Sequence, residues 1–152
     1  MVLLIEIIDI RSRLDSDEVR QVIDASYSIE YPPSQREAET DKILAGYRRR
    51  TDELLFGAQS NGQLIGFMGL RWRGPQEATI RHIAVRRDFR NKGVGRRLVL
   101  FAMENFELRS LESETHIGAV EFYQRLGFSV TSLGEKYPGT ERFLCRLDAT
   151  AL

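Results

Sequence analysis

The sequence predicts an α+β fold, in which a mixed, mostly antiparallel sheet of six or seven strands is flanked by about four helices. Apolar residues recur at helical spacing in four segments, and short apolar runs typical of strands lie between them. Asn61-Gly62 joins two of these runs and is a strong signal for a hairpin turn. No repeat, low-complexity tract or linker interrupts the 152 residues, so we expect a single domain over residues 1–152.

The first third of the chain predicts one strand and two helices. Residues 2–8 form an apolar run that is typical of a mostly buried strand. Asp15 can cap a helix over residues 16–27, whose apolar side chains recur at helical spacing. A Pro-Pro pair then breaks this helix, and a more polar second helix is expected over residues 35–50.

The middle of the chain predicts an antiparallel meander. Residues 54–59 and 63–72 read as strands on either side of the Asn61-Gly62 turn. A Gly-Pro turn leads into a third strand that ends at Val85. The next helix is expected over residues 94–106, where five apolar side chains can be buried on one face.

The last third predicts a strand, a short helix and a final pair of strands. Residues 111–115 read as a strand, and residues 119–126 read as a helix that Gly127 ends. Residues 128–133 and 142–147 then pair as strands around a Tyr-Pro-Gly turn.

The charge of the chain is balanced overall but concentrated locally. There are 22 basic and 22 acidic side chains, whereas residues 81–97 contain seven cations and only one acid, Asp88. Such a local site suits a small polyanion better than a nucleic acid, which prefers a broad basic face. We therefore expect no nucleic-acid partner.

Other features of the composition exclude further classes of protein. No apolar run is long enough for a transmembrane helix, and the apolar start carries Glu6 and Asp9 and lacks a basic leader. The single cysteine, Cys145, allows no internal disulfide and no cysteine-based metal cluster. We expect a cytoplasmic protein that needs no metal and does not bind membranes.

A glycine-bearing turn connects the strand ending at Val85 to the helix of residues 94–106. Its sequence R-N-K-G-V-G starts at Arg90 and combines glycines with cations. Glycines let backbone N–H groups approach an anion, and the new helix directs its unpaired N–H groups the same way. The alternative is a solvated run of charge, but cations at a helix start are unfavourable unless an anion binds there.

Two motifs resemble those of the GNAT superfamily of N-acetyltransferases. The first is [LI]-A-V-x-x-x-[FY]-[RQ]-x-x-G-x-G, and the second, about thirty residues later, is A-x-x-[FY]-Y-x-x-x-G-F. The matching residues are Ile83, Ala84, Val85, Phe89, Arg90, Gly93 and Gly95, followed by Ala119, Phe122, Tyr123, Gly127 and Phe128.

The resemblance implies a GNAT-type α/β sandwich with a splayed central strand pair, in which acetyl-CoA is the acyl-donor cosubstrate. The pantetheine arm lies along the backbone of the strand like an added strand. The turn then receives the pyrophosphate, and His116 stands where the family often has an asparagine that binds pantetheine. The implied cofactor-binding residues are Ile83, Ala84, Val85, Arg90, Asn91, Lys92, Gly93, Val94, Gly95, Arg96 and His116.

The implied reaction is direct attack of an unprotonated amine on the thioester in a ternary complex. Tyr123 matches a tyrosine that protonates the leaving thiolate, although it could instead be a core aromatic. The positions where family members carry a glutamate or histidine base align with Thr79 and Arg81. Glu77, on the same strand face, could act through a water. Alternation places His82 on the opposite face as a structural histidine, unless a bulge in the strand turns it toward the site.

The acceptor is expected to be a primary amine of a small molecule or peptide. Tyr27, Tyr31 and Trp72 are the candidate substrate-binding residues, and nearby glutamates favour a cationic acceptor. A homodimer is expected by analogy with the family. Two alternatives stay open: a non-catalytic acyl-CoA-binding module on the same fold, and a nucleotide-binding protein that uses the turn for another diphosphate.

Overall fold

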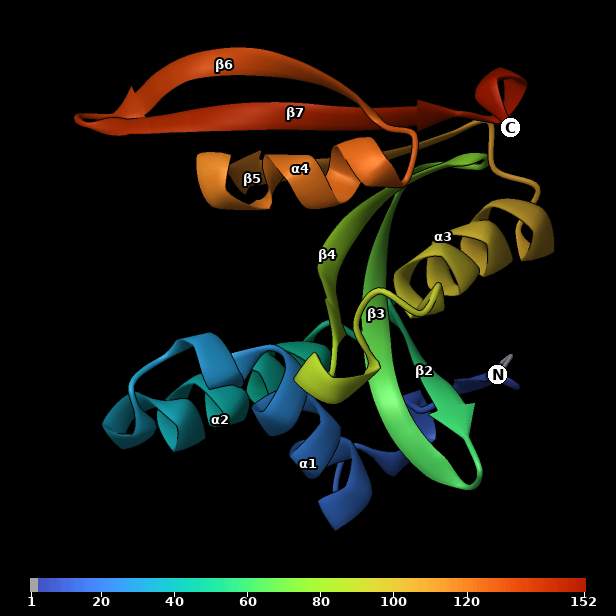
Figure 1. Cartoon of the computed structure of the whole chain (residues 1–152), viewed down its shortest axis with the longest axis vertical. Helices are drawn as coiled ribbons and strands as arrows, with labels where there is room; N and C mark the ends of the chain where they lie inside the picture. Colours follow the sequence, from blue (N-terminus) through green and yellow to red (C-terminus); the bar gives the residue numbers. More distant parts are fainter. Residues whose placement is uncertain (1–2) are drawn as a thin grey trace. The chain divides into compact units, whose positions relative to one another are not determined.

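The computed structural model describes residues 3–152, which contain seven strands and four α-helices (Figure 1). The strand order is β1-β2-β3-β4-β5-β7-β6. β4 and β5 run parallel, whereas β1–β2, β2–β3, β5–β7 and β6–β7 are antiparallel. The predicted α+β class with a mixed, mostly antiparallel sheet and four helices is therefore confirmed.

The chain divides into two compact units, which are described separately. The first unit contains the residues up to Arg71 together with Arg81–Leu98. The second unit contains Trp72–Ile80 and Val99–Leu152. β3 (Gln63–Gly74), β4 (Glu77–Val85) and α3 (Val94–Asn105) each contribute residues to both units.

Helices α1 (Asp17–Ser26) and α2 (Pro33–Arg49) belong to the first unit. The side chain of Ser16 caps α1 by accepting a hydrogen bond from the Val19 N–H at 3.2 Å, so the cap expected at Asp15 was wrong by one residue. α2 starts two residues before its predicted start, because proline fits the first turn of a helix, whose N–H groups lack intrahelical acceptors.

Strands β1 (Glu6–Asp9) and β2 (Leu54–Ser60) also belong to the first unit. β1 is shorter than the predicted strand and ends one residue later, and Val2 lies outside the described residues. The β2–β3 hairpin turns at Asn61 (φ 51°) and Gly62 (φ 76°), which confirms the turn expected from this pair.

The core of the first unit joins α1 and α2 to the strands. α2 is polar overall, yet it buries a strip of three large side chains. Burial of such an apolar strip stabilises a helix in a folded protein more than the intrinsic helix propensity of its residues does. The core cluster consists of Ile10, Val19, Val22, Ile23, Ile43, Leu44, Tyr47, Leu55, Leu64 and Phe67.

The second unit contains β5 (Ser110–His116), α4 (Ile117–Arg125), β6 (Ser129–Tyr137) and β7 (Thr140–Asp148). α4 packs against all three strands. Gly127, with φ at 95°, ends this helix as expected. β5 pairs with β7 along its whole length, and the parallel β4–β5 ladder joins residues 77–79 to residues 110–112 at the beginning of both strands.

Candidate functional site

The turn between β4 and α3 exposes backbone next to cations. Asn91 (φ 62°) and Gly93 (φ 82°) both adopt the left-handed conformation, and a side chain at Gly93 would meet no other atom within 4 Å. Glycine is therefore favoured here by its backbone angle and not by lack of space. Asn91, Lys92, Gly93 and Arg96 are exposed, so the turn can present N–H groups and positive charge to an anion.

The α3 start completes this anion-binding arrangement. The Arg97 N–H donates to the Gly93 carbonyl at 3.0 Å, so the helical hydrogen bonds begin at Gly93. The N–H groups of the first helical residues have no intrahelical acceptor and carry the positive end of the helix dipole. Val94 and Gly95 are buried, which anchors the turn to the first unit.

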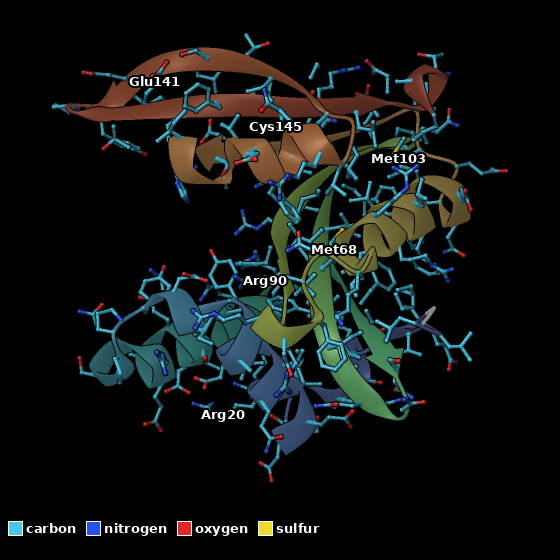
Figure 2. All side chains as sticks on the ribbon, viewed as in Figure 1. Arg20, Met68, Arg90, Met103, Glu141 and Cys145 are labelled. Atoms are coloured by element: carbon cyan, nitrogen blue, oxygen red, sulfur yellow. The ribbon has the colours of Figure 1, made fainter. Side chains whose placement is uncertain are left out.

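Arg90, which is labelled in Figure 2, is held by three contacts within the first unit. Its Nε donates to the Val85 carbonyl at 2.9 Å. One terminal nitrogen lies 3.3 Å from both the Ser26 carbonyl and the Glu30 carboxylate. Arg90 therefore ties the end of β4 to the end of α1 and the following 3-10 helix, whereas Lys92 and Arg96 extend into solvent.

The backbone of residues 83–85 depends on a glycine that sequence analysis did not identify. A Cβ at Gly66 on β3 would lie 2.8 Å from the Ala84 carbonyl and 3.4 Å from Val94 Cγ1. Only glycine at this position lets β3 approach β4 so closely. Ala84 itself packs against the core cluster of the first unit.

His82 is enclosed by aromatic side chains. Its Nδ1 shares a hydrogen bond with the Tyr47 hydroxyl at 2.7 Å, and its ring stands edge-on to Tyr27 at 5.2 Å. Burial, followed by the charges of Arg81 and Arg50, lowers the pKa of His82 from 6.5 to about 4. The imidazole is therefore uncharged at neutral pH.

The two tyrosines predicted to bind the acceptor lie together in the first unit. Burial raises the pKa of Tyr27, with smaller contributions from Tyr31 and Glu39. Burial also raises the pKa of Tyr31, supported by the charge of Glu39 and a hydrogen bond with it. Both phenols stay protonated, and the Glu39 carboxylate shares a hydrogen bond with the Tyr31 side chain.

Arg81 occupies one of the positions where the resemblance places a base, and it is engaged in a buried ion pair. Its Nε lies 3.2 Å from the carboxylate of Glu53, which is only 1% exposed and also pairs with Arg50 at 2.6 Å. Without these cations the buried carboxylate would be strongly unfavourable. Arg81 thus compensates the charge of Glu53.

Glu77, the predicted base through a water, lies in the second unit within a charged group. Its carboxylate is 3.7 Å from the Arg73 guanidinium, which is also 3.7 Å from Glu112. Arg73 additionally donates to the Ser110 hydroxyl at 3.3 Å. The Glu77 side chain is 44% exposed, so water can reach it.

Tyr123 is buried on α4, with 6% exposure. Its ring stands edge-on to Phe122 and Phe128 at 5.2 and 5.3 Å. The Ser113 hydroxyl on β5 donates to the Tyr123 oxygen at 2.8 Å. Sequence analysis missed Ser113, because nothing in its local pattern distinguishes it from an ordinary strand serine.

His116 caps α4. Its Nδ1 accepts a hydrogen bond from the Gly118 N–H at 3.1 Å, so the neutral ring carries its hydrogen on Nε2. A Cβ at Gly118 would come within 2.9 Å of the imidazole, so the glycine makes room for this cap. The imidazole thus does what an asparagine side chain can do at a helix start.

Trp72 and Cys145 also lie in the second unit. Trp72 is 36% exposed and stands edge-on to Phe106 at 5.3 Å. The structure therefore groups Tyr27 with Tyr31 and places Trp72 in the other unit. Cys145 is fully buried on β7, and burial raises the pKa of its thiol, which fits the expected core role (Figure 2).

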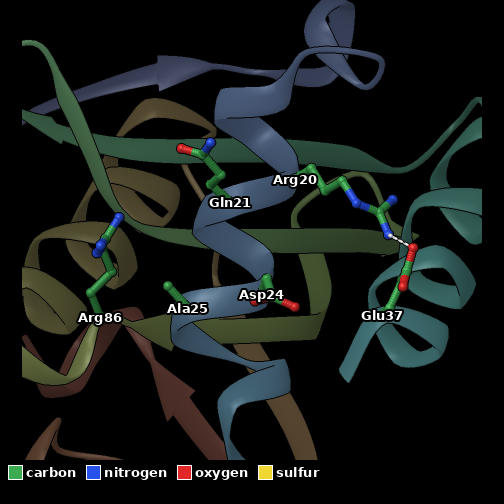
Figure 3. Close-up of a pocket in the computed structure, with 6 residues that line it drawn as sticks. All are labelled: Arg20, Gln21, Asp24, Ala25, Glu37 and Arg86. Carbon is green, nitrogen blue, oxygen red and sulfur yellow. Dashed lines mark ion pairs between the residues drawn. The ribbon is translucent and has the colours of Figure 1, made fainter. Parts of the chain in front are cut away.

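A surface hollow on α1 and α2 contains none of the predicted site residues. In Figure 3, Arg20 reaches from α1 toward Glu37 on α2, and the two side chains lie 4.0 Å apart. The hollow is lined by two arginines and two acids, whose formal charges cancel. The lining residues are Arg20, Gln21, Asp24, Ala25, Glu37 and Arg86. This balance gives the hollow no preference for a polyanion.

No helix within residues 3–152 combines the length and the apolar character that crossing a membrane requires. The same range contains no group of three or more histidine, cysteine, aspartate or glutamate side chains that could hold a metal ion.

Solved structures share this fold over almost the whole chain. PaiA N-acetyltransferase from Thermoplasma acidophilum, solved with coenzyme A, is 21% identical, with 96% of this chain and 99% of that chain covered and a TM-score of 0.71. The ribosomal-protein-S18-alanine N-acetyltransferase of Escherichia coli is 22% identical, with 95% and 94% covered and a TM-score of 0.69. No curated protein sequence matches the chain.

The sequence also matches a family model. The model described as the acetyltransferase (GNAT) family aligns with residues 17–128, which include the turn before α3, the end of β4 and Tyr123. This range covers well over half of the chain, from the start of α1 to the end of the second motif. The chain therefore belongs to the GNAT family of acetyltransferases.

Proposed function

We propose that the protein transfers an acetyl group from acetyl-CoA to a primary amine by direct attack in a ternary complex. The observation that carries this proposal is the turn of residues 90–96. It combines left-handed Asn91 and Gly93, exposed cations and a helix start, directly after the β4 residues of the family motif. These features suit a pyrophosphate.

In this proposal the backbone of Ile83, Ala84 and Val85 pairs with the pantetheine amides. The N–H groups of residues 91–96 bind the pyrophosphate, with charge added by exposed Lys92 and Arg96. Arg90 contributes its charge without a direct contact to the pyrophosphate, because two backbone carbonyls and Glu30 already bind its guanidinium. The Nε2–H of His116 supplies a donor for a pantetheine carbonyl.

The proposed chemistry uses Tyr123 as general acid and an N–H near Ala84 or Val85 as the oxyanion donor. The amine nitrogen attacks the thioester carbon, the C–S bond breaks, and the sulfur takes the phenolic proton. Glu77 removes the proton of the amine through a water, which its 44% exposure permits.

Aromatic faces and a carboxylate favour a cationic acceptor. Tyr27 and Tyr31 stay neutral beside Glu39, and such a group can hold a protonated amine by charge and cation–π contact. The name of one structural relative gives an alanine of ribosomal protein S18 as the acceptor, so small-molecule and peptide amines both belong to the proposal. The role of Trp72 in acceptor binding, a cytoplasmic location and a homodimer stay predictions.

Release of coenzyme A thiol from acetyl-CoA, measured with a panel of small amines and peptide N-termini, tests this proposal. We expect amine-dependent thiol release. A second candidate is a non-catalytic acyl-CoA-binding module, which the engagement of Arg81 with buried Glu53 at a base position favours. Binding of acetyl-CoA without thiol release for any amine would support that candidate, and binding of a nucleotide alone would contradict both.

A further inference from the structure

The strongest unassigned feature is the buried hydrogen bond between Ser113 and Tyr123. Ser113 is 3% exposed, and its hydroxyl donates to the phenolic oxygen at 2.8 Å. Both partners are held in place: Ser113 lies in the middle of the ladder between β5 and β7, opposite Cys145. The Tyr123 ring is fixed by two edge-on phenylalanines.

The direction of this hydrogen bond has a chemical consequence. Because Ser113 is the donor, the phenolic hydrogen of Tyr123 is not directed at Ser113 and can be given to another acceptor. When that proton leaves, the oxygen becomes a phenolate. The Ser113 hydroxyl then donates to a charged acceptor, and such a bond is stronger than the same bond to a neutral phenol.

We propose that Ser113 is a positioning residue for acetyl transfer, which directs the proton of Tyr123 and stabilises its phenolate. This inference rests on the proposed role of Tyr123 as general acid. In the step, the C–S bond breaks, the sulfur keeps the bonding electron pair, and the phenolic proton moves to it. The phenolate, held by Ser113, then regains a proton from water.

A purely structural role for Ser113 would be to satisfy a buried hydroxyl. In that case its removal would lower stability and leave the kcat of the folded protein unchanged. The proposed role predicts instead that Ser113 matters for turnover only while Tyr123 carries its hydroxyl, because there is otherwise no phenolate to stabilise.

The experiment compares Ser113→Ala, Ser113→Cys and Ser113→Thr in the wild-type and Tyr123→Phe backgrounds. Cysteine fills the space of serine with a weak donor, so it avoids the cavity that alanine leaves. Threonine keeps the hydroxyl, so Ser113→Thr should retain the kcat that the alanine and cysteine variants lose. Ser129→Ala makes the same chemical change at an exposed serine of β6 and serves as the control.

We expect kcat to fall about tenfold for the alanine and cysteine variants, while the Kd of acetyl-CoA changes less than about twofold. The threonine and Ser129→Ala variants should stay within about threefold of the wild type. Tyr123→Phe should lose more than about tenfold, and adding Ser113→Ala or Ser113→Cys should cause no further loss.

Two results would overturn the inference while leaving Tyr123 in the mechanism. In the first, Ser113→Cys and Ser113→Ala both keep the kcat of the wild type, while the kcat of Tyr123→Phe is reduced. The other is a further loss of turnover when either change is added to Tyr123→Phe. Wild-type kcat in Tyr123→Phe would overturn the role of Tyr123 and the inference with it, and a wild-type protein that acetylates no amine would contradict the proposed function itself.

Discussion

His82 shows how one residue links the packing of the first unit to pH. Its imidazole shares a hydrogen bond with Tyr47 and stands against Tyr27, while Arg81 and Arg50 add positive charge nearby. Burial of the ring disfavours its protonated form most, and the charges of Arg81 and Arg50 add to this effect. The folded state therefore binds a proton at His82 less readily than the unfolded state does.

This difference predicts a loss of stability in mild acid. The folded pKa of about 4 lies below the ordinary 6.5, so the unfolded state binds more protons between these values. The contribution of His82 to the free energy of unfolding is fully present above pH 6.5, declines as pH falls, and is lost by pH 4. The expected change is up to about 3 kcal/mol.

Urea unfolding of the wild type and His82→Gln between pH 4 and pH 8 measures this effect. Glutamine does not titrate, so the difference between the two free energies of unfolding isolates the histidine from the carboxylates. We expect the wild type to lose its advantage over the variant as pH falls from 6.5 to 4. A difference that is constant with pH would show that the imidazole is not kept neutral by folding.

At the scale of elements, Gly66 controls how closely β3 approaches the end of β4. A Cβ there would lie 2.8 Å from the Ala84 carbonyl, and a backbone atom cannot move away as easily as the end of a side chain. We predict that Gly66→Ala lowers the free energy of unfolding by about 1–3 kcal/mol. It should also weaken coenzyme A binding, because residues 83–85 form the proposed pantetheine site.

Gly74→Ala is the matched control for this prediction. Gly74 lies on the same strand, and a Cβ there would meet its nearest atom, in the Glu77 side chain, at an ordinary 3.5 Å. Chemical denaturation and calorimetric titration with coenzyme A should place this variant close to the wild type. Equal effects of the two substitutions would argue against a specific steric requirement at Gly66.

The start of α4 supports a second prediction at this scale. His116 accepts the Gly118 N–H, so His116→Ala should lose the cap and lower the free energy of unfolding by about 1 kcal/mol. His116→Asn supplies an equivalent acceptor and should retain most of the stability. Thermal or urea unfolding measures these changes. Equal stabilities of His116→Ala and His116→Asn would show that the His116 side chain does not cap the helix.

For the whole molecule, the sequence predicted the architecture because its signals are local. Hydrophobic periodicity indicated the helices and strands, and Asn61-Gly62 indicated the hairpin. The turn before α3 could also be anticipated, since the conformation of Gly93 depends on its own backbone. Boundaries were less certain, as the Ser16 cap and the early start of α2 show.

Contacts between distant residues could not be predicted in this way. Tyr47 and His82 are 35 positions apart, and the turn arginine Arg90 reaches back 60 positions to Glu30. Such partners depend on which elements pack together and at which register. The sequence therefore offered candidate site residues by their type, but their partners became clear only in the folded chain.

In the proposed function the turn of residues 90–96 binds the pyrophosphate of coenzyme A, and Gly93→Glu is the variant that changes this turn. A Cβ there would meet no other atom within 4 Å, so the substitution adds negative charge to the proposed anion site without a clash at Cβ, although the φ of 82° strains any residue other than glycine. Gly62→Glu is the matched control, because Gly62 has a similar φ of 76° and equally open surroundings.

Calorimetric titration of coenzyme A into the wild type and both variants is the measurement. We predict that the wild type and Gly62→Glu bind with similar Kd, whereas Gly93→Glu shows no detectable binding although it stays folded. Binding of coenzyme A to Gly93→Glu with the Kd of the wild type would contradict the account.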